Sequence, residues 1–138
     1  MRFDAAAGPV LRPAGRHVIF RQRMRIRKET DNLNTEDIML VAKCSDALGH
    51  PARVEIFQHI YSENLQRRTV CNRDLVERFG LAQATVSQHM NKLTGSGLIT
   101  AQQQGTKNCY YVNLGLLGHY VNSIRKLNKP LAGRDDNA

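Results

Sequence analysis

The chain lacks several features that would suit it to a membrane, to secretion or to single-stranded nucleic acid. It has no tryptophan, and only 6% of its 138 residues are aromatic, so it offers little surface on which unpaired bases could stack. No apolar run approaches the ~20 residues that a membrane-spanning helix needs, and the N-terminus has no apolar core of a secretory signal. We therefore expect a cytoplasmic protein with no membrane partner.

Paired cysteines and ligand-spaced histidines are also missing. Cys44, Cys71 and Cys109 are an odd number without close spacing, which fits reduced thiols inside a cell better than a disulfide framework. None of the histidines forms the i, i+4 pair of a helical metal site, and motifs with catalytic mechanics, such as a nucleophile elbow, are absent. The sequence thus predicts no metal site, no cofactor, no catalytic residue and no enzyme.

Positive charge is present, but it is unevenly distributed. The net charge is +8; residues 1–30 hold eight Lys/Arg against two acids, whereas residues 31–138 hold twelve against ten. We interpret residues 1–33 as a basic, disordered arm, residues 34–129 as one folded domain, and residues 130–138 as a flexible tail.

Three interpretations of the basic arm stay open. Its arginines and lysine could lie on DNA phosphates or in a minor groove, they could form a solvated tail without a role, or the natural protein could start at Met24. In each case, the DNA affinity of the folded domain must come from the local placement of Lys and Arg and not from bulk charge.

The most informative stretch lies between Asn72 and Ile99. A short helix over residues 72–79 is predicted to end at Gly80, since glycine readily adopts the left-handed conformation found at helix ends. A second helix begins two or three residues later, and two helices joined by so tight a turn make a helix-turn-helix. Within the second helix, an apolar stripe at i, i+4 and i+7 faces the core; it consists of Val86, Met90 and Leu93.

The opposite face of the second helix carries small, hydroxyl and amide side chains that suit contact with base edges. A glutamine can hold adenine through two hydrogen bonds, Ser and Thr bond several bases, and an alanine methyl can contact a thymine methyl. Such residues are also common on solvated helix faces, so the plain surface interpretation stays beside this one. The predicted DNA contacts are Gln83, Ala84, Thr85, Ser87, Gln88, His89, Asn91, Lys92 and, on the wing described below, Lys107.

Two helices are predicted before this unit and a β hairpin after it. Asn34 can cap the first helix, and the second begins with Pro51 at its first position. The second helix is expected to turn inward Val54, Phe57, Ile60 and Tyr61. After the helix-turn-helix, residues 98–100 and 109–112 are strand candidates on either side of a stretch with hairpin-turn chemistry. They form a two-stranded wing with Lys107 near its tip.

The last predicted helix starts at about Leu114, with Asn113 as its cap, and ends near Asn128. It carries two neighbouring apolar stripes, a broader apolar surface than one small domain needs. We expect a two-fold homodimer interface shared with the first helix; packing on the chain's own core is the alternative. The predicted interface residues are Ile38, Val41, Leu114, Leu117, Tyr120, Val121 and Ile124.

This order of elements, together with several short motifs, resembles the ArsR/SmtB-type winged-helix repressors of bacteria. The motifs are the segment 47–53 before the second helix, residues 85–90 in the second helix of the helix-turn-helix, and Gly97, Gly105 and Tyr110-Tyr111 around the wing. The resemblance covers about residues 35–127.

The resemblance implies a mainly α fold with a small β hairpin: a winged helix-turn-helix with a three-helix core, a wing, and N- and C-terminal dimerisation helices. It also implies a homodimeric, sequence-specific repressor that binds a palindromic operator in double-stranded DNA. The family's DNA contacts fall on Gln83, Thr85, Ser87, Gln88 and His89, with support from Lys107. One departure is Ala82, which stands where the family offers a serine cap worth roughly 1 kcal/mol.

The resemblance does not supply an effector. Family members that sense arsenic or soft metals use a Cys-X-Cys pair before the helix-turn-helix, since soft ions need thiolates held close together. Here Cys71 keeps the first position and Arg73 occupies the second. A second family site uses Asp and His on the terminal helix, where this chain offers His119 and no acid. Neither site is expected.

Other hypotheses stay open beside the repressor. The strand that ends at Cys71 commonly pairs with the returning wing strand in winged helices, which would bring Cys109 near it and permit a redox disulfide or a two-thiol soft-metal site. Buried cysteines that fill the core are the plainer interpretation. An enzyme using Cys109 and His119 has no support beyond residue type. A winged helix that binds only protein is disfavoured by the small, polar face described above.

Overall fold

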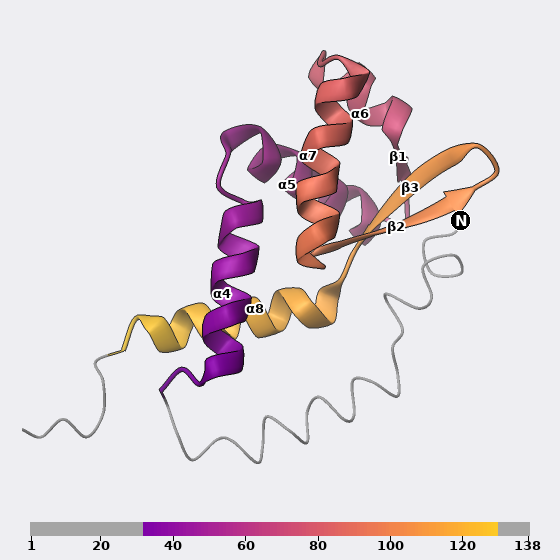
Figure 1. Cartoon of the computed structure of the whole chain (residues 1–138). Helices are drawn as coiled ribbons and strands as arrows, with labels where there is room; N and C mark the ends of the chain where they lie inside the picture. The colour runs from indigo at the N-terminus through magenta and orange to yellow at the C-terminus, as the bar shows by residue number, and fades with distance from the viewer. Residues whose placement is uncertain (1–31, 130–138) are drawn as a thin grey trace, which may run out of the picture.

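The computed structural model describes residues 32–129 (Figure 1). Most of the predicted basic arm, the alternative start at Met24 and the predicted tail lie outside the described residues. The described chain forms, in order, α4 (Thr35–Ala47), α5 (Pro51–Leu65), β1 (Val70–Cys71), α6 (Asn72–Phe79), α7 (Gln83–Ser96), β2 (Ile99–Gln104), β3 (Lys107–Val112) and α8 (Leu114–Leu127). The predicted mainly helical fold with a β hairpin is confirmed.

Local sequence signals set the helix ends. The Asn34 side chain accepts a hydrogen bond from the backbone N–H of Asp37 at 2.7 Å, and the Asp37 carboxylate accepts one from the N–H of Asn34 at 3.3 Å, a reciprocal cap. The Nδ1 atom of His50 caps α5 by accepting from the N–H of Ala52 at 3.0 Å. Gly80 ends α6 with φ +63°, as predicted.

The sheet has three strands in the order β1-β3-β2, all antiparallel. β2 and β3 form the predicted hairpin, with Gly105 at φ +68° in its turn. The hairpin projects to one side of the helices as the wing (Figure 1). β1 adds only Val70 and Cys71 to the sheet, and these residues lie opposite Tyr110 and Cys109. The wing is therefore tied to the start of α6 through β1.

The core lies between α5, α6, α7 and the base of the sheet. Val86, Met90 and Leu93 of α7 are buried there, as predicted, and they meet Leu75 of α6. Further core residues come from the neighbouring elements: Ile56, Ile60, Val70, Ile99 and Val112.

The predicted inward face of α5 is partly wrong. Val54 is 46% exposed, whereas Ile56 and Ile60 are fully buried; Phe57 and Tyr61 pack only at the edge of the core. The buried face continues to Asn64, whose Oδ1 accepts a hydrogen bond from the N–H of Val112 at 3.0 Å. Ile56, Ile60 and Asn64 lie four residues apart and so share one helix face, and the polar residue on this buried face misleads an argument from apolar spacing.

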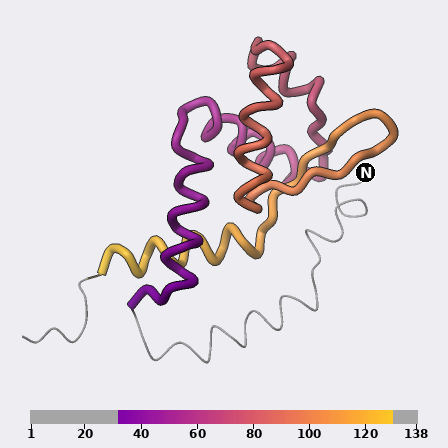
Figure 2. Tube along the Cα trace, in the orientation of Figure 1, coloured from indigo at the N-terminus to yellow at the C-terminus, as the bar shows by residue number. Residues whose placement is uncertain are grey.

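The helices at the two ends of the described chain meet. α4 packs against α8, which runs across it beneath the rest of the domain (Figures 1 and 2). Asn113 caps α8 as predicted, with its Oδ1 accepting from the N–H of Leu116 at 3.1 Å. Residues 32–129 contain no helix that is both long and apolar enough to span a membrane.

Candidate nucleic-acid interface

The outer face of α7 presents the residues predicted from sequence to contact DNA. Gln83, Ala84, Gln88, Asn91 and Lys92 are exposed, and Thr85, Ser87 and His89 are partly exposed. The buried stripe on the opposite side of α7 fixes this orientation, because residues three and four apart share one face of a helix. The structure therefore places the predicted α7 contacts, apart from His89, on the exposed polar side of the helix.

The first turn of α7 has no capping side chain. Ala82 occupies the cap position, and no side-chain hydrogen bond to the first turn is formed there, as expected from the missing serine. The N-terminus of a helix carries partial positive charge, and its N–H groups suit a phosphate oxygen. Gln83 and Ala84 thus lie where an anionic backbone is favoured.

His89 differs from the other predicted contacts because it packs against α5. Its ring lies 4.9 Å from the ring of His50 between centroids, and its Nδ1 lies 3.4 Å from Nη1 of Arg53. Burial lowers the pKa of His89, and the neighbouring His50 and Arg53 lower it further. The lowered pKa favours the neutral imidazole, which packs on His50 and lies within hydrogen-bonding distance of Arg53.

Arg53 is a component of this surface that is absent from the predicted contacts. Its Nε donates to the backbone carbonyl of Ala47 at 2.6 Å, so the end of α4 holds the guanidinium beside α7. The sequence signal was the Pro51-Ala52-Arg53 segment, which carried the family resemblance but was not assigned a role. A guanidinium held in this position is a suitable phosphate contact.

Lysine side chains flank the surface at both ends. Lys92 lies 3.3 Å from Asp46 of α4, and both side chains are exposed. Because an exposed ion pair contributes little stability, a DNA phosphate can replace Asp46 as the partner. Lys107 is exposed at the first position of β3, opposite Gln104, which places it near the tip of the wing, as predicted.

The junction between α6 and the wing is covalent. Cys71 and Cys109 form a disulfide, so the expectation of three reduced thiols is wrong for this pair; the antiparallel register of β1 and β3 places the two residues directly opposite one another. Beside the disulfide, the Tyr110 hydroxyl donates to Oδ1 of Asn72 at 2.7 Å. Cys44 is buried and unbonded.

Of the predicted dimer residues on α4 and α8, only Ile38 and Val121 are exposed, while Leu114 and Leu117 pack against the chain's own core and the Tyr120 hydroxyl lies 3.0 Å from Oγ of Ser45 on α4. Ile38 is 53% exposed and Val121 is 43% exposed. Their neighbours on these helices are only partly covered by the chain itself: Val41, Leu114, Leu117, Tyr120 and Ile124. Met39 and Leu127 add further exposed apolar surface on the same two helices.

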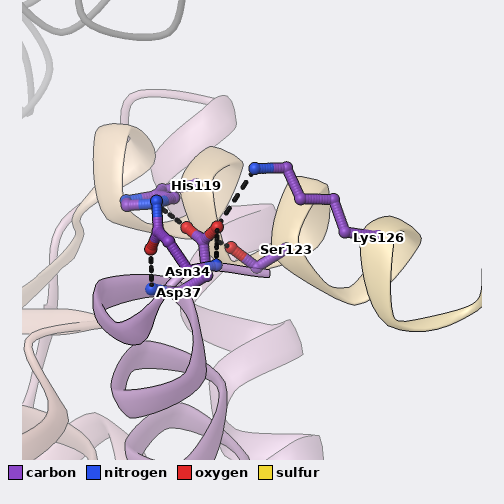
Figure 3. Close-up of polar contacts among 5 residues, drawn as sticks. All are labelled: Asn34, Asp37, His119, Ser123 and Lys126. Atoms are coloured by element: carbon purple, nitrogen blue, oxygen red, sulfur yellow. Dashed lines mark hydrogen bonds and ion pairs between the residues drawn. The ribbon is translucent and has the colours of Figure 1, made fainter. Parts of the chain in front are cut away.

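A buried carboxylate joins these two helices (Figure 3). Asp37 of α4 is fully buried; its Oδ1 lies 3.0 Å from Nε2 of His119 and accepts from the Ser123 hydroxyl at 3.3 Å, and its Oδ2 accepts from Lys126 at 3.0 Å. Burial alone would raise the pKa of Asp37, but the hydrogen bonds from His119, Lys126 and Asn34 outweigh it and lower the pKa to about 2.

The terminal helix offers His119 and no acid over residues 114–124, as the sequence shows. The acid that His119 contacts comes from α4, far away in the sequence. The cluster around Asp37 has the chemistry of a salt bridge and not of a metal site, because a lysine ammonium occupies one carboxylate oxygen. Within residues 32–129, no group of three or more His, Cys, Asp or Glu side chains is placed to hold a metal ion.

Comparison with known proteins gives consistent matches. The family model described as bacterial regulatory protein, arsR family, matches residues 50–101. An arsenical resistance operon repressor of Staphylococcus xylosus is 35% identical over 75 residues, which are 54% of this chain and 66% of the relative. An HTH-type transcriptional regulator of Methanocaldococcus jannaschii is 31% identical over 71 residues, 51% of this chain and 75% of the relative.

A second arsenical resistance operon repressor, from Staphylococcus aureus, is 32% identical over 59 residues. The chain spans 57% of its length, so the two arsenical repressors are each matched over less than two thirds. Among solved structures, an ArsR-like transcriptional regulator from Rhodococcus superposes with a TM-score of 0.56 at 18% identity, covering 65% of this chain and 80% of the other. HlyU from Vibrio cholerae gives 0.53 at 15% identity, covering 69% and 98%; these two likenesses show the fold.

Proposed function

Because this chain belongs to the ArsR family of bacterial regulatory proteins, we propose that it is a transcriptional regulator that binds double-stranded DNA. The observation that carries the proposal is the exposed polar face of α7, which the buried stripe of the same helix holds outward beside the wing. Members of the family are DNA-binding regulators and not enzymes, and the contacts used here need no cofactor. A regulator of this kind acts in the cytoplasm, where bacterial DNA lies.

Side-chain chemistry indicates which residues of this surface contact bases and which contact phosphates. Gln88, Ser87 and Thr85 on α7 read base edges in the major groove, each good bidentate contact giving about 1–3 kcal/mol of discrimination. Lys92 and Lys107 neutralise phosphates and fix the register of the protein on the duplex. His89 packs against His50 and Arg53 and so supports the position of α7.

We further propose that the regulator is a homodimeric repressor of a palindromic operator. The exposed apolar residues on α4 and α8, among them Ile38 and Val121, support a two-fold interface, because such interfaces pair one patch with its own copy. Two copies of α7 would then enter successive major grooves about 34 Å apart. Occupation of the operator blocks transcription.

Replacement of Gln88 tests the base-contact role. We expect Gln88→Ala to remove the preference for operator over random DNA, with weak, salt-sensitive binding remaining, because phosphate contacts are unaffected. The measurement is a mobility-shift titration on DNA from upstream of the protein's own gene, with random DNA of equal length beside it. Gln58→Ala is the matched control, since Gln58 is an exposed glutamine on α5, outside α7 and the wing.

Two outcomes would contradict the proposal. An equal loss of affinity for operator and random DNA in Gln88→Ala would remove the base-contact role. Failure of the unmodified protein to shift any DNA over a range of salt concentrations would favour a winged helix that binds only protein.

A further inference from the structure

The disulfide joins the start of α6, the first helix of the helix-turn-helix, to the wing. Cys71 is the last residue of β1 and directly precedes α6, while Cys109 lies on β3, the returning strand of the wing. Because β1 contributes only two residues to the sheet, few backbone hydrogen bonds hold the wing to the helix-turn-helix at this junction. A covalent bond between these two strands therefore strengthens the attachment of the wing more than it would between two long, fully hydrogen-bonded strands.

The bond also closes a loop of chain that contains both α7 and the turn of the wing. Cys71 and Cys109 are 38 residues apart in sequence, and the segment between them contains α6, α7, β2 and the turn of the wing. With the bond formed, α7 and the wing belong to one closed loop. With the bond broken, the wing keeps its chain connections to α7 and α8 and its noncovalent contacts, among them the short β1 pairing and the hydrogen bond from Tyr110 to Asn72.

The two sulfur atoms differ in access. Cys109 is 1% exposed, whereas Cys71 is partly exposed and precedes the first turn of α6. The partial positive charge of a helix N-terminus favours a thiolate; in the same turn the positive charge of exposed Arg73 is offset by Asp74, whose carboxylate accepts from the Cys71 N–H at 2.8 Å. Cys71 is therefore the thiol that a small oxidant reaches, and Cys109 is the thiol that completes the bond.

We propose that Cys71 and Cys109 are a reversible two-electron oxidation site for hydroperoxides, and that the resulting disulfide increases the affinity of the protein for its DNA. The proposal rests on the DNA-binding function proposed above. The increase follows from pre-organisation: a wing fixed against the helix-turn-helix has less conformational freedom to lose when both engage one duplex. While the disulfide stands, neither sulfur is a thiolate, so the geometry favours this redox role over a soft-metal site.

The chemistry balances without a metal or cofactor. The Cys71 thiolate attacks one peroxide oxygen, the O–O bond breaks, and the released alkoxide or hydroxide takes up a proton; Cys71 is left as a sulfenic acid. Cys109 then attacks the Cys71 sulfur, the S–O bond breaks, and the leaving hydroxide takes the thiol proton as water. Two thiols and one hydroperoxide thus give a disulfide, one alcohol or water, and one further water. A dithiol reverses the bond by exchange and becomes a disulfide itself.

Other contacts at the junction do not depend on the oxidation state. Tyr110 keeps its hydrogen bond to Asn72, and Gln104 of β2 donates through Nε2 to the Tyr111 hydroxyl at 3.0 Å. The Oε1 atom of Gln104 lies 3.7 Å from the Cys109 sulfur, where a reduced thiol can donate to it. The reduced protein therefore keeps its fold, and the oxidation state changes how firmly the wing is attached.

The test measures DNA binding by the full chain in both oxidation states. One sample is treated with hydrogen peroxide and one with dithiothreitol; intact mass, with a loss of two hydrogens, shows in which sample a disulfide has formed. Fluorescence anisotropy then gives Kd for operator and for random DNA. We expect the oxidised protein to bind operator at least about fivefold more tightly, the lower end of typical coupling between sites, and dithiothreitol to reverse the change.

Variants assign the effect to the pair. Cys71→Ser and Cys109→Ser are expected to bind like the reduced protein under both treatments, while Cys44→Ser keeps the response because Cys44 is outside the pair. Oxidation and reduction of the unmodified protein test the proposal without any variant. A variant that fails to fold therefore leaves this comparison intact. Selective binding that is equal in both states, or weaker after oxidation, overturns the switch and leaves the proposed function standing. Absence of selective binding in both states overturns both.

Discussion

Asp37 is a single residue that joins two helices from opposite ends of the folded domain. Its carboxylate is surrounded by His119, Ser123 and Lys126 of α8 and by the N-terminal turn of α4. A buried charge is costly unless it is paired and hydrogen-bonded, and each carboxylate oxygen here has a partner. The cluster thereby fixes how α4 and α8 cross, and with it the shape of the surface proposed for dimer formation.

The low pKa of Asp37 predicts a loss of stability in acid. Its pKa is lowered from 3.8 to about 2, so the cluster contributes stability at pH values above the unfolded pKa and loses it as the pH falls from about 4 through about 2. A shift of this size corresponds to about 2 kcal/mol of unfolding free energy. Urea unfolding of the unmodified protein and of Asp37→Asn across this pH range measures it.

The matched control for Asp37 is another acid on the same helix. Asp46 forms an exposed pair with Lys92, and Asp46→Asn is expected to change the unfolding free energy by less than about 1 kcal/mol. Asp37→Asn should be destabilised at neutral pH and should show a flatter dependence on pH below 4. Equal pH dependence in the two variants would mean that the Asp37 cluster does not stabilise the fold.

At the scale of elements, the turn between α6 and α7 determines the orientation of α7, the helix proposed to contact bases. Gly80 has φ +63°, and an added Cβ would meet nothing within 4 Å there. The cost of Gly80→Ala therefore comes from the left-handed backbone alone, roughly 1–2 kcal/mol. We expect a corresponding decrease in the free energy of unfolding, measured by urea denaturation.

Gly95 provides a control of opposite sign. It lies inside α7 with an ordinary helical backbone, and a Cβ there would also meet nothing within 4 Å. Alanine is preferred over glycine in a helix by about 0.5–1 kcal/mol, so Gly95→Ala should raise the stability. If both substitutions moved the unfolding free energy in the same direction, the left-handed turn would not be the source of the effect.

These elements also show which parts of the fold and site were predictable from sequence. The ends of α6, the outward polar face of α7 and the hairpin turn followed from local signals, because a glycine, a repeat of apolar residues or a turn sequence acts within one element. The inward face of α5 depends on Asn64 and on Val112, 48 residues away. A buried Asp37 was equally invisible to periodicity, because spacing arguments place carboxylates at the surface.

The covalent junction was only partly predictable. Pairing of β1 with the wing, and with it the proximity of Cys71 to Cys109, was one of two open hypotheses beside cysteines that only fill the core, and the disulfide depends on a register that places the two residues directly opposite one another. A shift by one residue would have turned the side chains to opposite faces of the sheet. Sequence fixes such a register only through the packing of both strands on the core.

At the scale of the whole molecule, α4 and α8 carry apolar side chains that a single copy of the chain leaves exposed to solvent. Val121 is 43% exposed at the middle of α8, and Ile38 is 53% exposed on α4. Exposed apolar residues grouped on two packed helices are typical of an interaction site. In the proposed homodimer this surface is covered by its own copy, and the distance between the two α7 helices is set by how the α8 helices meet.

A charge placed in that surface tests the dimer. In a two-fold interface Val121→Glu introduces two carboxylates, one from each copy, and burial of an unpaired charge is strongly unfavourable. We expect dimer dissociation to become easier by about 2 kcal/mol or more, seen as a monomer by light scattering at concentrations where the unmodified protein is a dimer. Leu65→Glu is the control, because Leu65 is 62% exposed at the end of α5 and outside the surface.

The Val121→Glu monomer should keep weak affinity for one half-site and lose the dependence on half-site spacing, since only two linked copies of α7 sense that spacing. A Val121→Glu protein that stays dimeric and keeps the spacing dependence would show that the copies meet elsewhere.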